Sequence, residues 1–293
     1  MTEALRTPAE LLEGLPQFPF AARFREHDGL RLAHVDEGQG APVVFVHGEP
    51  TWSFLWRHVI PPVRDAGFRC LAPDHAGFGR SDKPVELDWY SYARHCAALA
   101  GLLEELDLHG VTMVVHDWGG PVGLRVAVEH PERVERMVIM DAGLFSGHQR
   151  MTDAWLAFRE FVARTPDLPV GLLVRRACAH DPGDEVIAAY DAPFPSPEHK
   201  AGARAFPLLI PTAPQDPGAR DGQRVLEALR EDRRPVLMLW ADSDPIMPLS
   251  TGERFAQAIG CEAPEVIAGA GHFLQEDRGA DIGRRIAGWL TGS

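Results

Sequence analysis

The segment from Val111 to Gly123 places the strongest constraint on how this chain of 293 residues can fold. It opens with a short apolar run, residues 111–115, that is rich in β-branched side chains and is typical of a buried strand. A helical pattern follows the Gly119-Gly120 pair, and Asp117 lies in the turn between the predicted strand and this helix. A strand that turns sharply into a helix around one polar side chain is a nucleophile elbow, here with a carboxylate in place of serine.

Apolar runs and helical patterns alternate on both sides of this segment. Strands are predicted at 24–27, 30–36, 42–46, 68–72, 111–115, 134–140, 235–240 and 265–267, and helices at 52–63, 90–106, 122–128, 251–259 and 281–290. Between residues 144 and 230 only helical patterns and prolines occur. The order predicts an α/β fold with a mostly parallel central sheet flanked by helices. Residues 1–143 and 231–293 would form this core domain, and residues 144–230 an inserted helical cap.

Charge and cysteine usage exclude several classes of partner. The formal net charge of −13 argues against nucleic acid and anionic membranes. The N-terminal residues carry acidic side chains and no long apolar run, which predicts neither a secretory signal nor a membrane span. Four widely spaced cysteines without a CxxC motif indicate neither a disulfide framework nor a zinc site. We therefore expect a cytoplasmic protein that acts as a monomer.

Polar side chains follow five of the predicted strands. They are Glu49, Asp117, Asp141, Asp244 and His272. Ligands of an open parallel sheet bind beyond the carboxyl ends of its strands, so these side chains are expected to meet there. The chain order of nucleophile, acid and histidine is that of the α/β-hydrolases.

Each of these residues suits one chemical role. A carboxylate is already ionised at neutral pH, so Asp117 can attack carbon without a base and form an ester. His272 can then take a proton from the water that hydrolyses this ester. An acid must hold the imidazole, and we assign Asp244 to this role, with Asp141 as the alternative. The backbone N–H groups of Glu49 and Trp118 would form the oxyanion hole.

Six motifs, taken together, resemble those of the haloalkane dehalogenases. They are HGEPTW at 47–52, PDHAGFGRSDKP at 73–84, VVHDWGG at 114–120, YDAPFP at 190–195, KAGARAFP at 200–207 and GAGHFLQED at 269–277. The chain is most similar to the subgroup with Glu in HGEP and an acid after the late strand. The resemblance implies an α/β-hydrolase that cleaves carbon–halogen bonds of a small haloalkane with water. Its products would be an alcohol, a halide ion and a proton, and it would need no cofactor and no metal.

The resemblance also implies a role for individual residues. The catalytic residues would be Asp117, Asp244 and His272, with Glu49 beside the attacking water. The ring N–H of Trp118 and that of a cap tryptophan would bind the halide, because an indole offers one neutral donor and no acceptor. Trp155 is the default for this second donor, although Phe158 could occupy the matching position. The expected pocket residues are Phe158, Phe206, Pro207 and Ile210.

Two other functions share parts of this pattern. An epoxide hydrolase has the same Asp and His but also a pair of cap tyrosines, and Tyr190 is the only tyrosine in the predicted cap. A non-catalytic binding protein of the same fold usually has a broken triad, whereas all three members are present here. One departure from the subgroup is His116, which stands where Gln often precedes the nucleophile.

Overall fold

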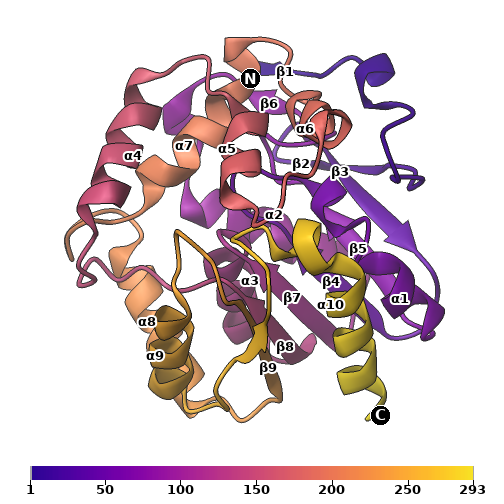
Figure 1. Ribbon diagram of the computed structural model, residues 1–293, viewed down its shortest axis with the longest axis vertical. Helices are drawn as coiled ribbons and strands as arrows, with labels where there is room; N and C mark the ends of the chain where they lie inside the picture. The colour runs from indigo at the N-terminus through magenta and orange to yellow at the C-terminus, as the bar shows by residue number, and fades with distance from the viewer. Residues whose placement is uncertain (1, 293) are drawn as a thin grey trace.

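A sheet of eight strands runs through the middle of the protein (Figure 1). The computed structural model describes residues 2–292, apart from the side chain of Ala154. The strand order is β10-β9-β8-β7-β4-β5-β3-β2. The bounds are β2 (Arg23–His27), β3 (Leu30–Glu37), β4 (Pro42–Val46), β5 (Arg69–Pro73), β7 (Val111–His116), β8 (Val134–Met140), β9 (Val236–Ala241) and β10 (Glu265–Ile267). Within this sheet, as far as residues 2–292 describe it, only the pairs β2·β3 and β3·β5 are antiparallel, so the predicted, mostly parallel sheet is confirmed.

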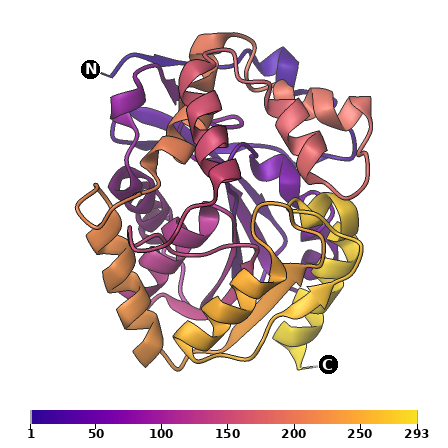
Figure 2. The same cartoon turned by 60° about the vertical axis from the view of Figure 1, so that its left-hand side comes forward.

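Helices cover both faces of this sheet (Figure 2). The helices α1 (Ile60–Asp65) and α10 (Leu274–Thr291) pack against each other on one face. On the other face α3 (Gly119–Glu129) lies between α2 (Tyr92–Glu105) and α8 (Ala219–Glu231), and α8 also contacts α9 (Leu249–Ile259). A separate short pair of strands joins β1 (Ala4–Leu5) to β6 (Lys83–Pro84).

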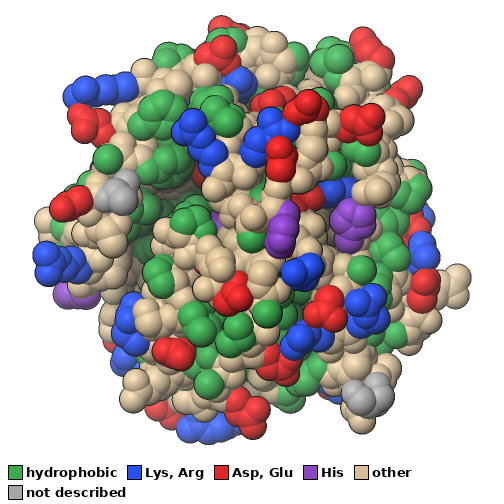
Figure 3. Space-filling view, in the orientation of Figure 1, with side chains coloured by type: hydrophobic (Ala, Val, Ile, Leu, Met, Phe, Trp, Pro, Cys, Tyr) green, Lys and Arg blue, Asp and Glu red, His purple; other side chains and the backbone are tan. Residues whose placement is uncertain are grey.

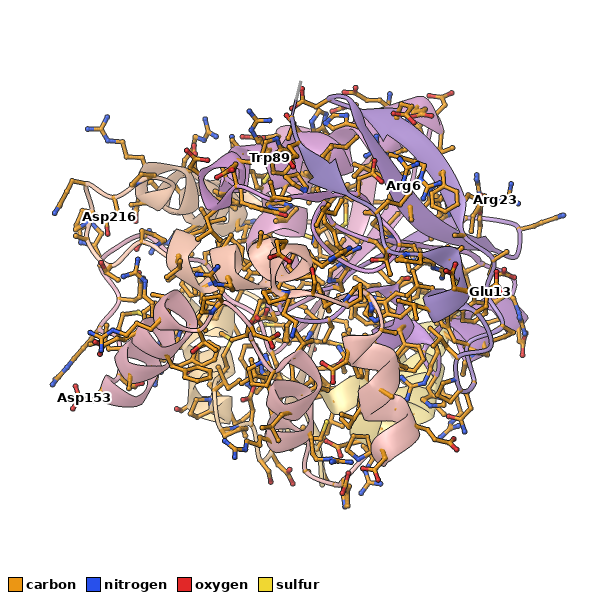
Figure 4. The ribbon with its side chains drawn as sticks, turned by 90° about the horizontal axis from the view of Figure 1, so that it is seen from above. Arg6, Glu13, Arg23, Trp89, Asp153 and Asp216 are labelled. Atoms are coloured by element: carbon orange, nitrogen blue, oxygen red, sulfur yellow. The ribbon has the colours of Figure 1, made fainter. Side chains whose placement is uncertain are left out.

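Four of the α-helices between β8 and β9 lie above one edge of the sheet (Figures 1 and 2). They are α4 (Asp153–Arg164), α5 (Val170–Ala177), α6 (Asp184–Asp191) and α7 (Ala201–Leu209). Seen from above, Asp153 of α4 and Asp216, which precedes α8, lie at one side of the molecule, opposite Arg23 of β2 (Figure 4). The predicted cap also includes α8, yet α8 packs against α3 and α9. We therefore propose that the cap ends before α8.

Most predicted elements agree with the structure to within a few residues, and the helix predicted at 52–63 is the main exception. The segment forms a 3₁₀ helix, Ser53–Trp56, and α1 begins only at Ile60. Pro61 and Pro62 occupy the first turn of α1, where a missing N–H costs nothing, and proline favours a helix start. Ser196 and Pro197 also begin a short 3₁₀ helix, Pro197–Lys200, with Ser196 at the N-cap and proline in the first turn, and the Ser196 hydroxyl contacts the side chains of Glu198 and His199.

The N-terminal segment packs on the core through two aromatic side chains. Phe18 and Phe20 are buried, and the Phe18 ring lies edge-on to Trp52 with 5.2 Å between the ring centroids. Within residues 2–292, no helix combines the length and the hydropathy needed to cross a bilayer.

Candidate active site

The turn after β7 brings Asp117 to the carboxyl edge of the sheet. Every residue of β7 is buried, and Asp117 adopts a φ of +49° before α3 begins at Gly119. A Cβ at Gly119 would lie 2.0 Å from the Val46 carbonyl oxygen of the neighbouring strand, so only glycine allows α3 this close to β4. The predicted elbow therefore forms, with the aspartate at its tip.

The Asp117 carboxylate is held from two sides. Its Oδ1 accepts a hydrogen bond of 2.8 Å from the Glu49 N–H, and its Oδ2 lies 3.6 Å from His272 Nε2. Burial opposes ionisation of Asp117, but the His272 imidazole and the Trp118 N–H outweigh it and hold the pKa below its ordinary value. The carboxylate is thus ionised at neutral pH, and its side chain is 20% exposed toward the space above it.

Asp244 orients the imidazole of His272. Its Oδ2 lies 2.7 Å from His272 Nδ1, and its Oδ1 accepts hydrogen bonds from the N–H groups of Ile246 and Met247. Burial alone would lower the pKa of His272, but Asp244 and Asp117 raise it well above its ordinary value. Burial would raise the pKa of Asp244, but the imidazole and the two N–H donors lower it. Asp244 and His272 thus form a buried ion pair at neutral pH.

Asp141, the alternative acid, lies in a different environment. It is fully buried, its Oδ1 accepts a hydrogen bond from the Ala241 N–H, and no hydrogen-bond partner is described for its Oδ2. Burial and the nearby Asp244 carboxylate raise the pKa of Asp141 well above its ordinary value, which favours the neutral acid. The structure thus brings Asp244, rather than Asp141, into hydrogen-bond contact with His272.

His116 contacts the backbone of the loop that carries His272. It is fully buried, and its Nε2 lies 2.8 Å from the His272 carbonyl oxygen. Burial and the charge of His272 lower the pKa of His116 to about 4, so the ring is neutral and donates its Nε2–H to that carbonyl.

His116, Asp141 and His272 also place potential metal-ligand atoms within 4.8 Å of one another. We assign no metal to them, because both ring nitrogens of His272 already face carboxylates.

A cavity of about 300 Å³ lies above the Asp117 carboxylate. Trp118, Trp155, Phe158, Pro207 and Ile210 line it, together with Glu49, Pro50, Asp117, Thr152, Leu173, Arg176, Ala177, Pro245, Ile246, His272 and Phe273. Figure 3 shows a hollow in this face of the molecule, lined by hydrophobic side chains, beside the position of α4 in Figure 1.

Phe206 differs from its predicted place in the pocket. It is not among the described residues that line the cavity, and its buried ring stacks on Trp118 with 5.0 Å between the centroids. Pro207 of α7 and Ile210, the residue after the end of α7, both face the cavity. Phe206 precedes Pro207 and is turned by about 100° around the helix axis, so it supports Trp118 from behind.

Comparisons with known proteins agree with this arrangement. The family model of the alpha/beta hydrolase fold matches residues 41–279. The haloalkane dehalogenase of Mycolicibacterium paratuberculosis is 42% identical, over 97% of each chain, and haloalkane dehalogenase 1 of Mycobacterium tuberculosis is 41% identical, over 98% of each. The chain belongs to the haloalkane dehalogenases. The solved structure of haloalkane dehalogenase DpaA from Paraglaciecola agarilytica, described as tetrameric, superposes with a TM-score of 0.90 at 34% identity, over 97% of both chains.

Haloalkane dehalogenases are hydrolases that act on carbon–halogen bonds, and the tyrosines of this member agree with that assignment. All three are described, and none lines the cavity. The Tyr90 and Tyr92 hydroxyls donate to the carbonyl oxygens of Pro84 and Pro121. The buried Tyr190 hydroxyl donates to Glu276. The tyrosine pair that marks an epoxide hydrolase is therefore missing from the described lining of this cavity.

Sequence reasoning missed two groups of residues in this dehalogenase. The first is Asp277, whose carboxylate accepts hydrogen bonds of 2.9 Å from the Gly271 N–H and the Ala179 N–H, and so ties the His272 loop to the end of α5. The second group comprises the residues of α5 and of the loop after β9 that line the cavity, namely Leu173, Arg176, Ala177, Pro245 and Ile246. The spacing of three and four residues on α5 was the only signal available for the second group.

Proposed function

We propose that this haloalkane dehalogenase acts in two steps, attack by Asp117 and hydrolysis of the resulting ester by water that His272 activates. The observation that carries the proposal is the line of contacts from Asp117 to His272 to Asp244 at the floor of an apolar cavity. The same floor presents Trp118, whose buried ring N–H has no described protein partner. A nucleophile, a base with its orienting acid and a free neutral donor thus meet in one place.

In the first step Asp117 Oδ2 attacks the carbon that bears the halogen. Oδ1 is held by the Glu49 N–H, which leaves Oδ2 as the freer oxygen. The new bond joins Oδ2 to carbon, and the carbon–halogen bond breaks with its electron pair on the departing halide. The apolar lining excludes water from the carboxylate, which strengthens its interaction with the reacting carbon.

In the second step the charge balance around His272 changes. The free carboxylates of Asp117 and Asp244 both raise the pKa of His272. Esterification removes the charge of Asp117, so the pKa of His272 falls and the imidazolium releases its proton to solvent. The neutral ring then takes a proton from water, whose oxygen attacks the carbonyl carbon Cγ of the Asp117 ester. The tetrahedral intermediate then breaks its bond to the alkoxide, which takes the proton from His272 and leaves as the alcohol. The new carboxylic acid of Asp117 gives its proton to His272, which restores the starting state, so the net reaction releases one halide and one proton.

We assign Glu49 to a position beside the attacking water. It is buried, it lines the cavity, and its Oε1 has no described hydrogen-bond partner. Burial and the Asp117 carboxylate raise the pKa of Glu49 well above its ordinary value. Its backbone N–H would hold the negative charge on Oδ1 of Asp117 in the tetrahedral intermediate, as it holds Oδ1 in the free protein.

The halide site is proposed to combine Trp118 with Trp155. These are the only two tryptophans among the described cavity-lining residues, and Trp118 follows the nucleophile directly. Phe158 also lines the cavity but offers no donor. Two neutral N–H groups would stabilise the developing halide without the strong charge-assisted bond of a cation, which would slow product release.

Release of halide is the experiment that tests this function. The purified protein is expected to release bromide and acid from 1-bromobutane and 1,2-dibromoethane, measured by ion chromatography and by pH indicator. Styrene oxide serves as the control substrate and is expected to remain intact. Turnover of styrene oxide, together with no halide release from a panel of bromo- and chloroalkanes, would contradict the proposal.

Replacing Trp118 or Trp155 by phenylalanine is expected to lower kcat/KM for 1-bromobutane about 10²-fold or more, the typical effect of losing one transition-state donor. Trp289, outside the cavity, provides the matched Trp289→Phe control. Thermal unfolding of each variant separates lost chemistry from lost packing. A Trp155→Phe variant as active as the Trp289→Phe control would remove Trp155 from the halide site.

Location and assembly are also proposals. All four cysteines are unpaired, two of them buried, and this suits the reducing cytoplasm that we propose for the protein. We propose a monomer as the active unit, and light scattering after size-exclusion chromatography measures the mass that decides it.

A further inference from the structure

Arg176 is a charged residue of the cavity lining that has no role in the proposed hydrolysis of an unsubstituted haloalkane. The charged or titratable side chains among the described lining residues are Glu49, Asp117, His272 and Arg176. The first three meet at the floor, where Asp117 contacts the other two. Arg176 comes from α5 in the cap, and it faces the cavity with Leu173 and Ala177 of the same helix. A permanent positive charge therefore borders a cavity that is otherwise mostly apolar.

The exposure of the lining residues places Arg176 at the mouth. Trp118, His272, Pro207 and Ile210 are buried, whereas Thr152, Arg176, Pro245 and Ile246 are exposed. The exposed members come from α5, the residue before α4 and the loop after β9, so they form a rim around the opening. An incoming substrate must pass this rim before its halogen reaches Trp118.

Arg176 also differs from its neighbour in the chain. Arg175 forms ion pairs with Asp181, at 3.0 Å, and with Asp184, and it does not line the cavity. No ion pair or hydrogen bond is described for the guanidinium of Arg176 within residues 2–292. In a protein with a formal net charge of −13, an unpaired cation at a cavity mouth is a local exception. Five N–H donors are therefore available there to an anion.

We propose that Arg176 makes this enzyme select haloalkanes that carry a carboxylate at the end opposite the halogen, the ω-haloalkanoic acids. The inference rests on the proposed function and names its substrate class. The halogen would enter toward Trp118, and the carboxylate would stay at the rim and bind the guanidinium in a charge-assisted hydrogen bond. A carboxylate close to the reacting carbon would be repelled by Asp117, so the two groups must lie at opposite ends. The products are the halide ion, a proton and the ω-hydroxyalkanoate.

The test compares 6-bromohexanoate with its neutral analogue 6-bromohexanamide. The Arg176→Gln variant is expected to lose about fivefold in kcat/KM for the carboxylate, the size of an exposed ion pair of about 1 kcal/mol, and to keep its kcat/KM for the amide. Arg175→Gln, beside it but outside the cavity, is the matched control and should leave both values unchanged. Added salt should reduce the carboxylate preference of the wild type and have little effect on that of Arg176→Gln.

Three outcomes would overturn the proposal. Equal changes for the acid and the amide would mean that Arg176 acts on cavity shape or on the leaving bromide rather than on the carboxylate. Unchanged values for both substrates would mean that the guanidinium does not meet the substrate. A wild type that prefers the amide at all salt concentrations would also contradict it. If neither substrate nor 1-bromobutane releases bromide, the failure lies in the proposed function instead.

Discussion

Replacing His272 by phenylalanine is expected to stop the reaction after a single bond cleavage and to leave the alkyl group on Asp117. The first step needs only the Asp117 carboxylate, which the Glu49 N–H continues to hold at 2.8 Å. The second step needs a base for water, and no other described ring nitrogen contacts Asp117. Loss of a general base typically costs about 10²–10⁴ in rate, so the ester should accumulate.

Intact-protein mass spectrometry measures this trapped ester. After incubation with 1-bromobutane, His272→Phe should gain the mass of one butyl group in place of a proton, and peptide mapping should place that group on Asp117. The double variant with Asp117→Asn is the control and should keep its original mass. An unmodified His272→Phe protein that has nevertheless released one equivalent of bromide would contradict the covalent scheme.

Replacing Asp244 by asparagine is expected to lower turnover about 10³- to 10⁴-fold, whereas Asp141→Asn should change it about threefold at most. Asp244 lies 2.7 Å from His272 Nδ1 and is ionised, so its loss removes the charge that stabilises the imidazolium. Asp141 is fully buried, and its raised pKa favours the neutral acid, which asparagine matches in shape and charge. The Ala241 N–H can still donate to the asparagine oxygen.

Steady-state halide release with 1-bromobutane measures both variants, and the pH profile adds a second readout. Asp244 raises the pKa of His272, so Asp244→Asn lowers it. Ester hydrolysis needs the neutral imidazole, and the acid limb of the residual activity should therefore move to lower pH. A larger loss in Asp141→Asn than in Asp244→Asn would transfer the acid role to Asp141.

The sequence was most informative where local patterns coincide with burial. The buried runs of β4 and β8 match their predicted bounds, and β7 extends its prediction by one residue. The turn at Asp28-Gly29 joins β2 and β3, and both residues have the positive φ of a tight hairpin. Local errors arose where side chains compete with the regular pattern, as Pro61 and Pro62 do at the start of α1.

The same limit applies inside the site. The cap is inserted between the two segments of the core domain. No local sequence pattern shows which face of a cap helix contacts the Asp117 elbow. Phe206 and Pro207 are adjacent in sequence, yet only Pro207 lines the cavity, because one step along a helix turns a side chain by about 100°. Arg176 was missed for this reason, although α5 brings it to the mouth of the cavity.

By itself the sequence determined the class of fold, the elbow with Asp117 and the polar residues that collect at one edge of a parallel sheet, because strand periodicity and chain order are local properties. Only the tertiary structure decided which acid contacts His272 and which charge borders the cavity. Asp141 and Asp244 both follow strands, and what separates them is burial and the donors around each carboxylate. Asp141 accepts its hydrogen bond from Ala241, 100 positions along the chain, and Asp244 contacts His272, 28 positions away, so no local pattern records which acid meets the imidazole.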